Sequence, residues 1–366
     1  MKIYFDDIIF DLQKAGGISK VWAKLCENFK TKDLINLQSD ISCNNVFYPK
    51  NLKKIEKDIN IKLSIRRYLP ILKIINCDIF HSSYYRIPLF INKNAKQVVT
   101  VHDFMYEFFD SGLKKHIHIW QKTKAMKYAD SIICVSEHTK NDLLKLYPQF
   151  KNKNIYVVYN GVDEEFTLIE NKKDFIKIND KDFENKKYFL YVGNRMGCKN
   201  FKFIIELMQK SIYLNKNNLN IVCVGGGKFT EEELALFNKF NYENKVHHVS
   251  NIDNYELNSL YNHALALLFP SSYEGFGIPA LEAQKAGCPV IYAKTSSLPE
   301  VMAYDELSYT LDSIEEIEEK FSLLENADLI NVLIDKGLTH ANKLSWEYCA
   351  SETLKVYERT LGLNNE

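Results

Sequence analysis

The stretch that decides the fold is "PSSYEGFGIPALEAQKAGCPVI", residues 270–291. It places Glu274 in a glycine-rich loop, Pro279 where it suits the first turn of a helix, and Gly287 where a helix would end. Glu282 is therefore expected about one turn inside a short helix that Glu274 precedes. Because the first N–H groups of a helix are unpaired within it and carry a partial positive charge, such a helix start suits an anion such as a diphosphate.

Short apolar runs alternate with amphipathic patterns on both sides of this stretch. Alternation of strand and helix is typical of parallel sheets covered on both faces, so the sequence predicts an α/β fold with two Rossmann-like domains in tandem. The predicted strands are 2–10, 77–83, 96–103 and 130–136 in the first domain, and 188–194, 219–227, 245–250, 265–271 and 288–293 in the second. The predicted division is a first domain at 1–168, a polar linker at 169–187, a second domain at 188–344, and a final helix within 345–366 that either covers the second domain or crosses back to the first.

Composition and charge limit the class of protein. No run of about 18 apolar residues occurs, and Asp6, Asp7 and Asp11 stand where a signal peptide needs basic and then apolar residues, so we expect a cytoplasmic location. The 8 cysteines lack the close pairs of zinc or redox motifs. The net charge of zero divides unevenly: residues 1–165 carry 26 Lys and Arg against 18 Asp and Glu, a net +8, which leaves −8 for the remainder.

Further blocks accompany the 270–291 stretch along the chain. They are "AGGISKVWAKL" (15–25), "TVHDFMYEFF" (100–109), "YNGVD" (159–163), "YVGNRMGCKNF" (191–201) and "SSLPEV" (296–301). Together they resemble the retaining, GT-B-fold glycosyltransferases of family four, over nearly the whole chain. The resemblance implies two Rossmann-like domains that face each other across a cleft, the first binding the acceptor and the second binding the nucleotide-sugar.

By motif position, the resemblance gives the two glutamates different roles. It places Glu274 at the hydroxyls of the donor sugar, close to the anomeric carbon, and Glu282 at the ribose of the nucleotide. The diphosphate between them would meet the N–H groups of Phe276, Gly277 and Ile278. A glycosidase-like carboxyl pair is the competing interpretation, and it is disfavoured because Glu282 would lie on a helix beside a phosphate.

Two cations, Arg195 and Lys199, stand four residues apart just past the predicted strand 188–194. Their charges would neutralise the phosphate that leaves, in place of the metal ion that other glycosyltransferases use, so neither a metal nor another cofactor is expected. The alternative is a solvated basic turn. The Asp-x-Asp at 180–182 falls in the predicted linker rather than after a strand, so we do not assign it to a metal, and "GGGKF" (225–229) lacks the spacing of a P-loop.

The first domain contributes further candidate residues. Gly16 and Gly17 follow the first strand and precede a helix, where a tight loop can bring backbone close to phosphate. His102 and Asp103 end a predicted strand, where a parallel sheet binds its ligands. The resemblance implies that His102 approaches the donor sugar; the alternative is a core histidine hydrogen-bonded to Asp103.

The predicted activity is retaining, metal-independent transfer of a hexosyl group from a nucleoside diphosphate to a hydroxyl of a glycan or lipid-linked acceptor, in surface polysaccharide or lipopolysaccharide synthesis. His81 and Ser82 are candidates for the acceptor side. A GDP-sugar is favoured over a UDP-sugar, because "SSLPEV" is similar to relatives that transfer mannose, and no nucleic-acid partner is expected. Two alternatives stay open: a nucleotide-sugar epimerase of the same fold, and a non-catalytic nucleotide-sugar-binding subunit.

The positive charge of the first half is densest at 50–67, where Lys50, Lys53, Lys54, Lys57, Lys62, Arg66 and Arg67 alternate with Ile and Leu. An anionic membrane surface attracts such a segment, which would place the enzyme peripherally on the inner face of the membrane. The alternative is a solvated helix face on a soluble enzyme, because Glu56 and Asp58 dilute the charge.

Overall fold

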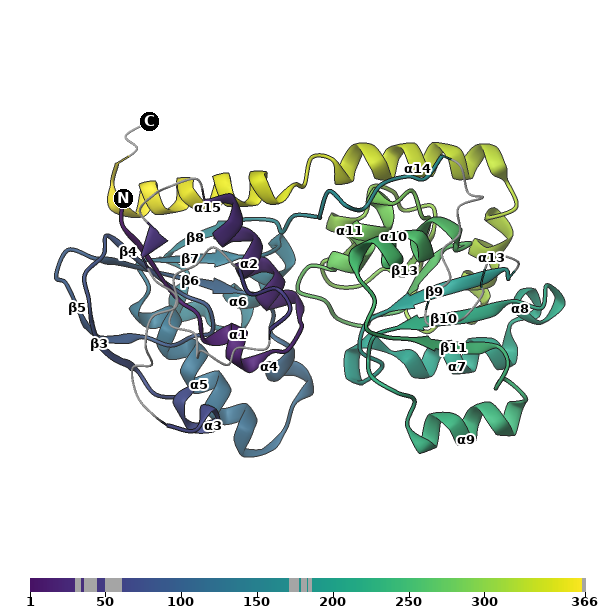
Figure 1. Ribbon diagram of the computed structural model, residues 1–366, viewed down its shortest axis with the longest axis horizontal. Helices are drawn as coiled ribbons and strands as arrows, with labels where there is room; N and C mark the ends of the chain where they lie inside the picture. The colour runs from purple at the N-terminus through teal and green to yellow at the C-terminus, as the bar shows by residue number, and fades with distance from the viewer. Residues whose placement is uncertain are drawn as a thin grey trace. The chain divides into compact units, whose positions relative to one another are not determined.

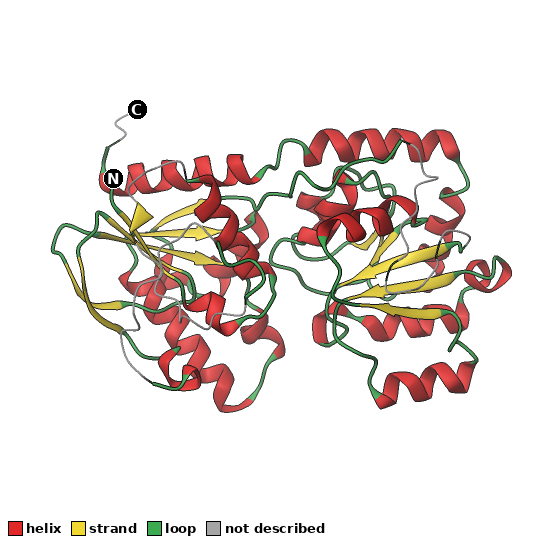
Figure 2. Ribbon diagram, in the orientation of Figure 1, coloured by secondary structure: helices red, strands yellow, loops and turns green. Residues whose placement is uncertain are grey.

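The structure is a computed structural model that describes residues 1–29, 34–35, 45–49, 61–170, 178, 183 and 186–363. The chain divides into two compact units, Met1–Gly161 together with Trp346–Glu366, and Val162–Ser345. In each unit helices cover a sheet of parallel strands (Figures 1 and 2). The α/β class predicted from the alternating pattern is confirmed.

The first unit is built on a six-stranded sheet of order β2-β1-β4-β6-β7-β8. A separate two-stranded parallel sheet pairs β3 with β5. The elements of this unit are β1 (Ile3–Asp6), α1 (Ile8–Leu12), α2 (Gly17–Asn28), β2 (Leu34–Ile35), α3 (Leu63–Arg66), β3 (Ile71–Ile75), β4 (Ile79–Ser82), β5 (Pro88–Ile91), β6 (Lys96–Val101), α4 (Met105–Phe109), α5 (Gly112–Tyr128), β7 (Ser131–Cys134), α6 (Glu137–Leu146), a 3₁₀ turn η1 (Pro148–Phe150), β8 (Asn154–Val157) and α15 (Trp346–Leu361).

The second unit has a six-stranded sheet of order β11-β10-β9-β12-β13-β14. Its elements are β9 (Tyr188–Val192), a 3₁₀ turn η2 (Gly197–Lys199), α7 (Phe201–Lys210), α8 (Ile212–Lys216), β10 (Asn220–Val224), α9 (Glu231–Phe240), β11 (Val246–Val249), α10 (Asn254–His263), β12 (Leu267–Phe269), α11 (Ile278–Lys285), β13 (Val290–Ala293), α12 (Leu298–Val301), β14 (Ser308–Tyr309), α13 (Ile314–Leu323) and α14 (Ala327–Ala341). The chain first builds this sheet outward from β9 to β11 and then returns to place β12 on the other side of β9. The loops that follow β9 and β12 therefore flank the topological switch point, which is where open α/β sheets bind their ligands.

Two sequence expectations about boundaries need correction. The predicted strand 2–10 ends at Asp6, and Ile8, Ile9 and Phe10 are buried residues of α1, because an apolar run of three residues is too short to show a strand or a helix period. The first unit ends at Gly161 rather than at 168. Residues 162–169 belong to the second unit, where the Thr167 N–H donates to the side-chain oxygen of Asn258 at 3.0 Å. Most of the predicted linker, including 180–182, lies outside the described residues.

The final helix belongs to the first unit. Helix α15 lies against α2, and the Tyr357 hydroxyl is 2.6 Å from Nδ1 of His81 on β4. The chain passes between the units next to Val162 and Ser345, which form an isolated parallel bridge.

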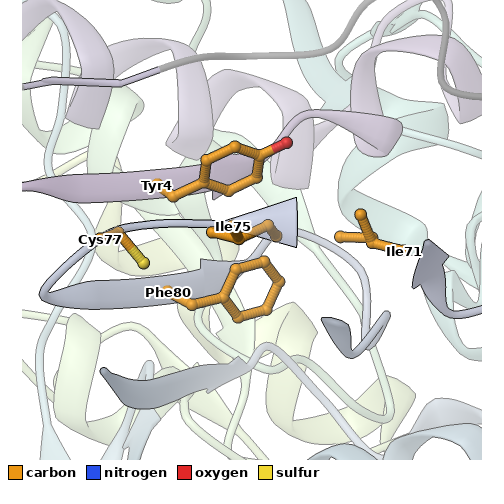
Figure 3. Close-up of a cluster of buried hydrophobic side chains, with 5 residues drawn as sticks. All are labelled: Tyr4, Ile71, Ile75, Cys77 and Phe80. Atoms are coloured by element: carbon orange, nitrogen blue, oxygen red, sulfur yellow. The ribbon is translucent and has the colours of Figure 1, made fainter. Parts of the chain in front are cut away.

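Apolar side chains fill the space between the main sheet of the first unit and the two-stranded sheet. Tyr4 of β1, Phe80 of β4, Ile71 and Ile75 of β3, and Cys77 form one buried cluster (Figure 3). The cluster fixes one side of β3 to the body of the unit. Within the described part of the chain, every helix is too short or too polar to cross a bilayer.

Candidate donor site

The stretch that opened the sequence analysis forms the loop between β12 and α11. Gly277 precedes α11 with φ = +103°, and a Cβ there would come within 2.9 Å of the Leu298 side chain, so only glycine fits without strain. Pro279 lies in the first turn of α11, and Gly287 follows its last turn with φ = +70°. The predicted start and end of this helix are confirmed.

Hydrogen bonds from the neighbouring segment fix this loop. The Glu274 N–H donates to Oγ of Ser296 at 2.8 Å. The Ser297 hydroxyl lies within hydrogen-bond distance of the carbonyl oxygens of Glu274, at 3.1 Å, and Phe276, at 2.9 Å. The two serine side chains fix the backbone of the loop that carries Glu274. The position of the Glu274 carboxylate therefore depends on this backbone as well as on its own side-chain contacts.

Lys199 brings its amine to this carboxylate. Nζ of Lys199 lies 2.5 Å from Oε1 of Glu274, and the two side chains are 24 % and 9 % exposed. The turn that carries Lys199 follows β9, and the Ser272 N–H joins it to the β12 loop by donating to the Cys198 carbonyl at 2.8 Å. The structure thus brings one cation and one carboxylate together beside the start of α11.

Glu282 lies one turn inside α11, and its side chain is buried. Its Oε2 lies 3.3 Å from the Tyr261 hydroxyl, which is also 3.2 Å from the Pro279 carbonyl. Burial, and next the charge of Glu282, raise the pKa of Tyr261 well above its usual value, so the phenol stays protonated and donates. Glu282 contacts Tyr261 of α10, whereas Glu274 pairs with Lys199 of the turn after β9.

Arg195 has a different environment from the one the sequence suggested. Its guanidinium forms a two-point ion pair with Glu233, with Nε 2.8 Å from Oε1 and Nη2 3.2 Å from Oε2. It also donates to the carbonyls of Gly225 and Gly227 at 3.0 Å each, and to that of Lys228 at 2.9 Å. The Arg195 side chain is only 3 % exposed. It is therefore bound to the glycine-rich loop after β10, which excludes the alternative of a solvated basic turn for this residue.

Sequence reasoning missed Glu233. Its carboxylate completes a capping box with Thr230 at the start of α9 and pairs with Arg195 at the same time. The signal was present in "TEEE" (230–233), because Thr followed three residues later by Glu is a helix-start pattern. The second partner of this carboxylate, 38 residues earlier in the chain, left no local signal.

The candidates of the first unit lie in two loops: His102 and Asp103 follow β6, whereas α1 separates β1 from Gly16 and Gly17. Gly16 precedes α2, and a Cβ there would meet the side chain of Gln13 at 2.5 Å, which is a close approach to a flexible group. His102 follows β6, and burial lowers its pKa to about 4, so the imidazole is neutral. Oδ1 of Asp103 accepts the N–H of Met105, the first residue of α4, at 3.0 Å. Gly17 is the first residue of α2.

His81 is not an acceptor-side residue. It is fully buried, with Nδ1 2.6 Å from the Tyr357 hydroxyl and Nε2 2.9 Å from Oγ1 of Thr100. Burial lowers the pKa of His81 to about 3. Both ring nitrogens are used inside the unit, so His81 joins the sheet to α15 and reaches no ligand.

Two carboxylates at the end of β1 were also missed as site candidates. Asp6 and Asp7 are buried, and Oδ2 of each has no hydrogen-bond partner within the described ranges. Asp6 pairs with Arg86 at 3.1 Å. Burial, and then the charges of Asp6 and Asp11, raise the pKa of Asp7 well above its usual value. Ser82 on the adjacent strand β4 likewise has a buried hydroxyl with no partner among the residues that the structure describes.

The fold defines a class: α/β proteins with two Rossmann-like units, whose open parallel sheets bind ligands at the switch point. Residues 171–337 match the family model described as glycosyl transferases group 1, and residues 23–166 match the model of glycosyltransferase family 4. The chain belongs to these group 1, family 4 glycosyltransferases, and its fold is GT-B.

Particular relatives and structures agree with this family. The O-antigen chain mannosyltransferase RfbU of Salmonella typhimurium is 30 % identical over 63 % of this chain and 60 % of its own length. The O-antigen chain mannosyltransferase B of Escherichia coli is 21 % identical over 76 % of this chain and 74 % of its own length. Among solved structures, Anabaena HepE in complex with UDP has a TM-score of 0.71 at 13 % identity and covers 98 % of this chain and 100 % of its own. WaaG, a glycosyltransferase of lipopolysaccharide biosynthesis, has a TM-score of 0.69 at 15 % identity and covers 97 % of this chain and 99 % of its own.

Proposed function

We propose that this chain is a retaining, metal-independent hexosyltransferase that moves a sugar from a nucleoside diphosphate to a hydroxyl of a glycan or lipid-linked acceptor. The observation that carries the proposal is the Lys199–Glu274 pair beside the start of α11, with Glu282 one turn further on. Together these groups supply a cation for the leaving phosphate, a carboxylate for the sugar hydroxyls and a second carboxylate for the ribose. The N–H groups of Phe276, Gly277 and Ile278, at the start of α11, are proposed to supply the remaining contacts to the diphosphate.

In the proposed mechanism the donor separates Lys199 from Glu274. The amine then neutralises the phosphate as the bond between the anomeric carbon and the phosphate oxygen breaks. The acceptor oxygen forms its bond on the same face of the sugar, and its proton passes to the leaving phosphate. Glu274 stabilises the positive charge that develops at the anomeric carbon. Retention follows because the two bonds share one face, and catalysis consists of positioning and charge stabilisation.

Arg195 enters this mechanism indirectly. Because its donors are committed to Glu233 and to three backbone carbonyls, it holds the Gly225–Lys228 loop in shape. We therefore propose Lys199 as the cation that meets the phosphate and Arg195 as a positioning residue. His102, Asp103, Gly16 and Gly17 are proposed to serve the same reaction from the first unit.

Surface polysaccharide synthesis is the proposed role, supported by the O-antigen mannosyltransferase names of two relatives. Those names also support a mannosyl donor and hence a guanine nucleotide, whereas HepE was solved with UDP and glucose. A thermal-shift comparison of GDP, UDP, ADP and dTDP decides the base. A larger stabilisation by UDP than by GDP would replace the guanine proposal.

Release of nucleoside diphosphate from the chosen nucleotide-sugar, measured with and without acceptor glycan, tests the activity itself. A transferase releases it faster when acceptor is present. An epimerase converts the sugar without releasing the nucleotide, and a non-catalytic binding subunit binds the donor without turnover; either result would refute the proposal. We place the reaction at the cytoplasmic face of the membrane, where a lipid-linked acceptor would be met.

A further inference from the structure

Three segments of the first unit contain basic residues and no acidic ones. They are 62–75, which includes α3 and β3; 86–93, which includes β5; and 112–128, which is α5. They carry four, two and five Lys or Arg, eleven in all, and neither Asp nor Glu. The whole chain has 47 basic and 47 acidic residues. The excess of positive charge is therefore a local property of these three segments and does not reflect the overall composition.

The three segments are neighbours in the folded unit. Strands β3 and β5 pair in parallel. The Gln121 side chain of α5 donates to the carbonyl of Arg67, which directly follows α3, at 2.5 Å. Trp120 of α5 lines one small cavity together with Pro70 and Ile87, which precede β3 and β5. Figure 1 shows α3 and α5 beside each other in this unit, with β3 and β5 at its edge. We call the three segments together the basic–apolar face.

Large apolar side chains are concentrated on this face. Twenty of them are exposed in the described part of the chain, and eight of the twenty belong to these three segments: Ile65, Leu72, Ile74, Leu89, Phe90, Leu113, Trp120 and Tyr128. Strand β3 shows how this arises. Ile71 and Ile75 enter the buried cluster of Figure 3, whereas Ile74 between them is 79 % exposed. A concentration of exposed apolar side chains is typical of an interaction surface when the side chains are contiguous.

Exposed apolar and basic side chains share one side of helix α5. Leu113, Trp120 and Tyr128 are spaced by 7 and 8 residues and so lie on one side of the helix, where they are 75 %, 55 % and 54 % exposed. Lys124 lies on the same side, with its amine 4.9 Å from the centre of the Trp120 ring. Lys114 and Lys127 are exposed beside this stripe.

The acids near α5 weaken the positive field only at one end. Glu107 turns inward, where its carboxylate pairs with the buried Lys122 at 2.9 Å and accepts from the Tyr147 hydroxyl at 3.0 Å. Asp110, just before the helix, is exposed. Along the rest of α5 the lysines are not countered by any acid of the helix itself.

We propose that the basic–apolar face docks on the surface of an anionic phospholipid bilayer, with Trp120, Leu113 and Ile74 inserted at the headgroup boundary. Lysines meet the lipid phosphates, and the apolar side chains enter the acyl boundary, so a bilayer satisfies both kinds of group at once. Arg66, Arg86 and Lys122 are paired with acids inside the unit. A second copy of this chain would still bring the remaining basic residues of the face against their like, which disfavours self-association through it. A soluble polyanion would satisfy the lysines and leave the leucines and isoleucines in water.

This inference deepens the proposed function, since it rests on the lipid-linked acceptor proposed above and assigns the surface that meets the lipid. It also moves the contact away from the sequence expectation at 50–67. Lys50, Lys53, Lys54 and Lys57 lie outside the described residues, and Arg66 is largely buried against Asp11. The face is instead carried mainly by α5 and the two-stranded sheet.

Fluorescence gives a direct test, because Trp22 and Trp346 are buried and Trp120 is exposed. Full-length protein is titrated with vesicles of phosphatidylcholine containing 0 to 40 % phosphatidylglycerol, at low and high salt, and binding is measured in parallel by flotation. We expect a blue shift of emission that grows with phosphatidylglycerol and falls with salt. The shift should vanish in Trp120→Phe, while flotation of that variant persists. No flotation with 40 % phosphatidylglycerol at low salt would overturn the inference.

Two sets of substitutions separate the lipid from other polyanions. Changing Lys114, Lys124 and Lys127 to Gln should weaken vesicle binding by roughly 100-fold, since each basic residue near the surface contributes about 1 kcal/mol, or about fivefold. Changing Leu113 and Ile74 to Ser should weaken it by at least about tenfold. Matched controls remove exposed residues of the same kinds from the second unit. Lys202→Gln combined with Lys216→Gln matches the lysine variant, and Tyr255→Ser matches the apolar variant. Both controls should bind vesicles as the parent does.

Binding to soluble polyglutamate is measured with the same variants. The lysine variant could lose binding to both vesicles and polyglutamate while the Leu113 and Ile74 variant binds both normally. That result would show that the partner is an acidic macromolecule and not a bilayer. Nucleotide release with a water-soluble acceptor should be unchanged in all of these variants. If that activity is absent from the parent while vesicle binding is present, the proposed function fails and the docking face stands.

Discussion

Replacing Glu274 by Gln should strengthen the binding of a bare nucleoside diphosphate while it abolishes most turnover. In the structure the Glu274 carboxylate holds the Lys199 amine at 2.5 Å, and a diphosphate must compete for that amine. The Gln side chain keeps the shape and one acceptor oxygen but removes the charge. Lys199 is then available to the phosphate before the ligand arrives.

The burial of the pair sets the size of the effect. With Lys199 24 % and Glu274 9 % exposed, the pair is less screened than a surface ion pair but is not sealed from water. We take about 1 kcal/mol, the upper end for exposed pairs, which corresponds to roughly fivefold tighter binding. The turnover number should fall by about 10²-fold, because the charge at the anomeric carbon loses its carboxylate. Glu282→Gln should instead weaken the same ligand by about 1.5–3 kcal/mol.

Calorimetric titration of the parent and both variants with nucleoside diphosphate, without sugar, measures the difference. Glu306→Gln is the matched control, because Glu306 pairs with Lys336 at 2.8 Å in the same unit but on exposed surface. If Glu274→Gln weakens the ligand more than Glu282→Gln does, the two glutamates have been assigned in reverse. Unchanged affinity in Glu274→Gln would mean that the pair does not compete with the phosphate.

Three further outcomes follow from the described contacts. Arg195→Lys keeps the charge but loses the hydrogen bonds to the glycine loop, so the free energy of unfolding in urea should fall by about 2–4 kcal/mol. Glu233→Gln should lower it by a similar amount. Normal stability with lost turnover would instead indicate that Arg195 contacts the phosphate directly. Gly226→Ala should lower stability by about 1–2 kcal/mol, since φ is +69° there and a Cβ would lie 2.9 Å from Nη1 of Arg195; a parent-like melting curve would contradict this. The pKa of His81 is lowered to about 3, so its contribution to stability is complete above about pH 6.5 and declines as pH falls toward 3, by about 1.4 kcal/mol per pH unit. Unfolding free energies of the parent and His81→Gln should therefore converge between pH 7 and pH 5, and parallel curves would show that this ring is solvated.

Local chemistry made the second unit predictable from sequence. Pro279, Gly277 and Gly287 each have a conformational preference that acts within a few residues, so the bounds of α11 could be read directly. The strands were found because parallel strands buried on both faces are short, uniformly apolar runs between turn residues. Ile8–Phe10 was mistaken for strand because an apolar run of three residues is too short to show a strand or a helix period.

Side-chain direction could not be predicted. Arg195 and Lys199 are four residues apart, yet one turns to Glu233 and the other to Glu274, because a 3₁₀ turn and a left-handed Asn200 lie within and after this segment. His81 looked like a site residue because it sits near a strand end, and only α15, 276 residues further along the chain, makes it a core residue. Partners so distant in sequence leave no periodic or spacing signal.

The return of α15 to the first unit has a consequence for how the protein is made. The second unit is one uninterrupted segment, Val162–Ser345, set into a first unit whose two parts flank it. On the ribosome, the second unit can therefore fold as soon as it emerges, while the surface of α2 and the ring of His81 wait for Tyr357. The part of the chain that is synthesised first is the last to complete its tertiary structure. A nascent chain stalled before residue 346 would expose the surface of α2 that α15 covers in the complete protein, and a chaperone could bind there.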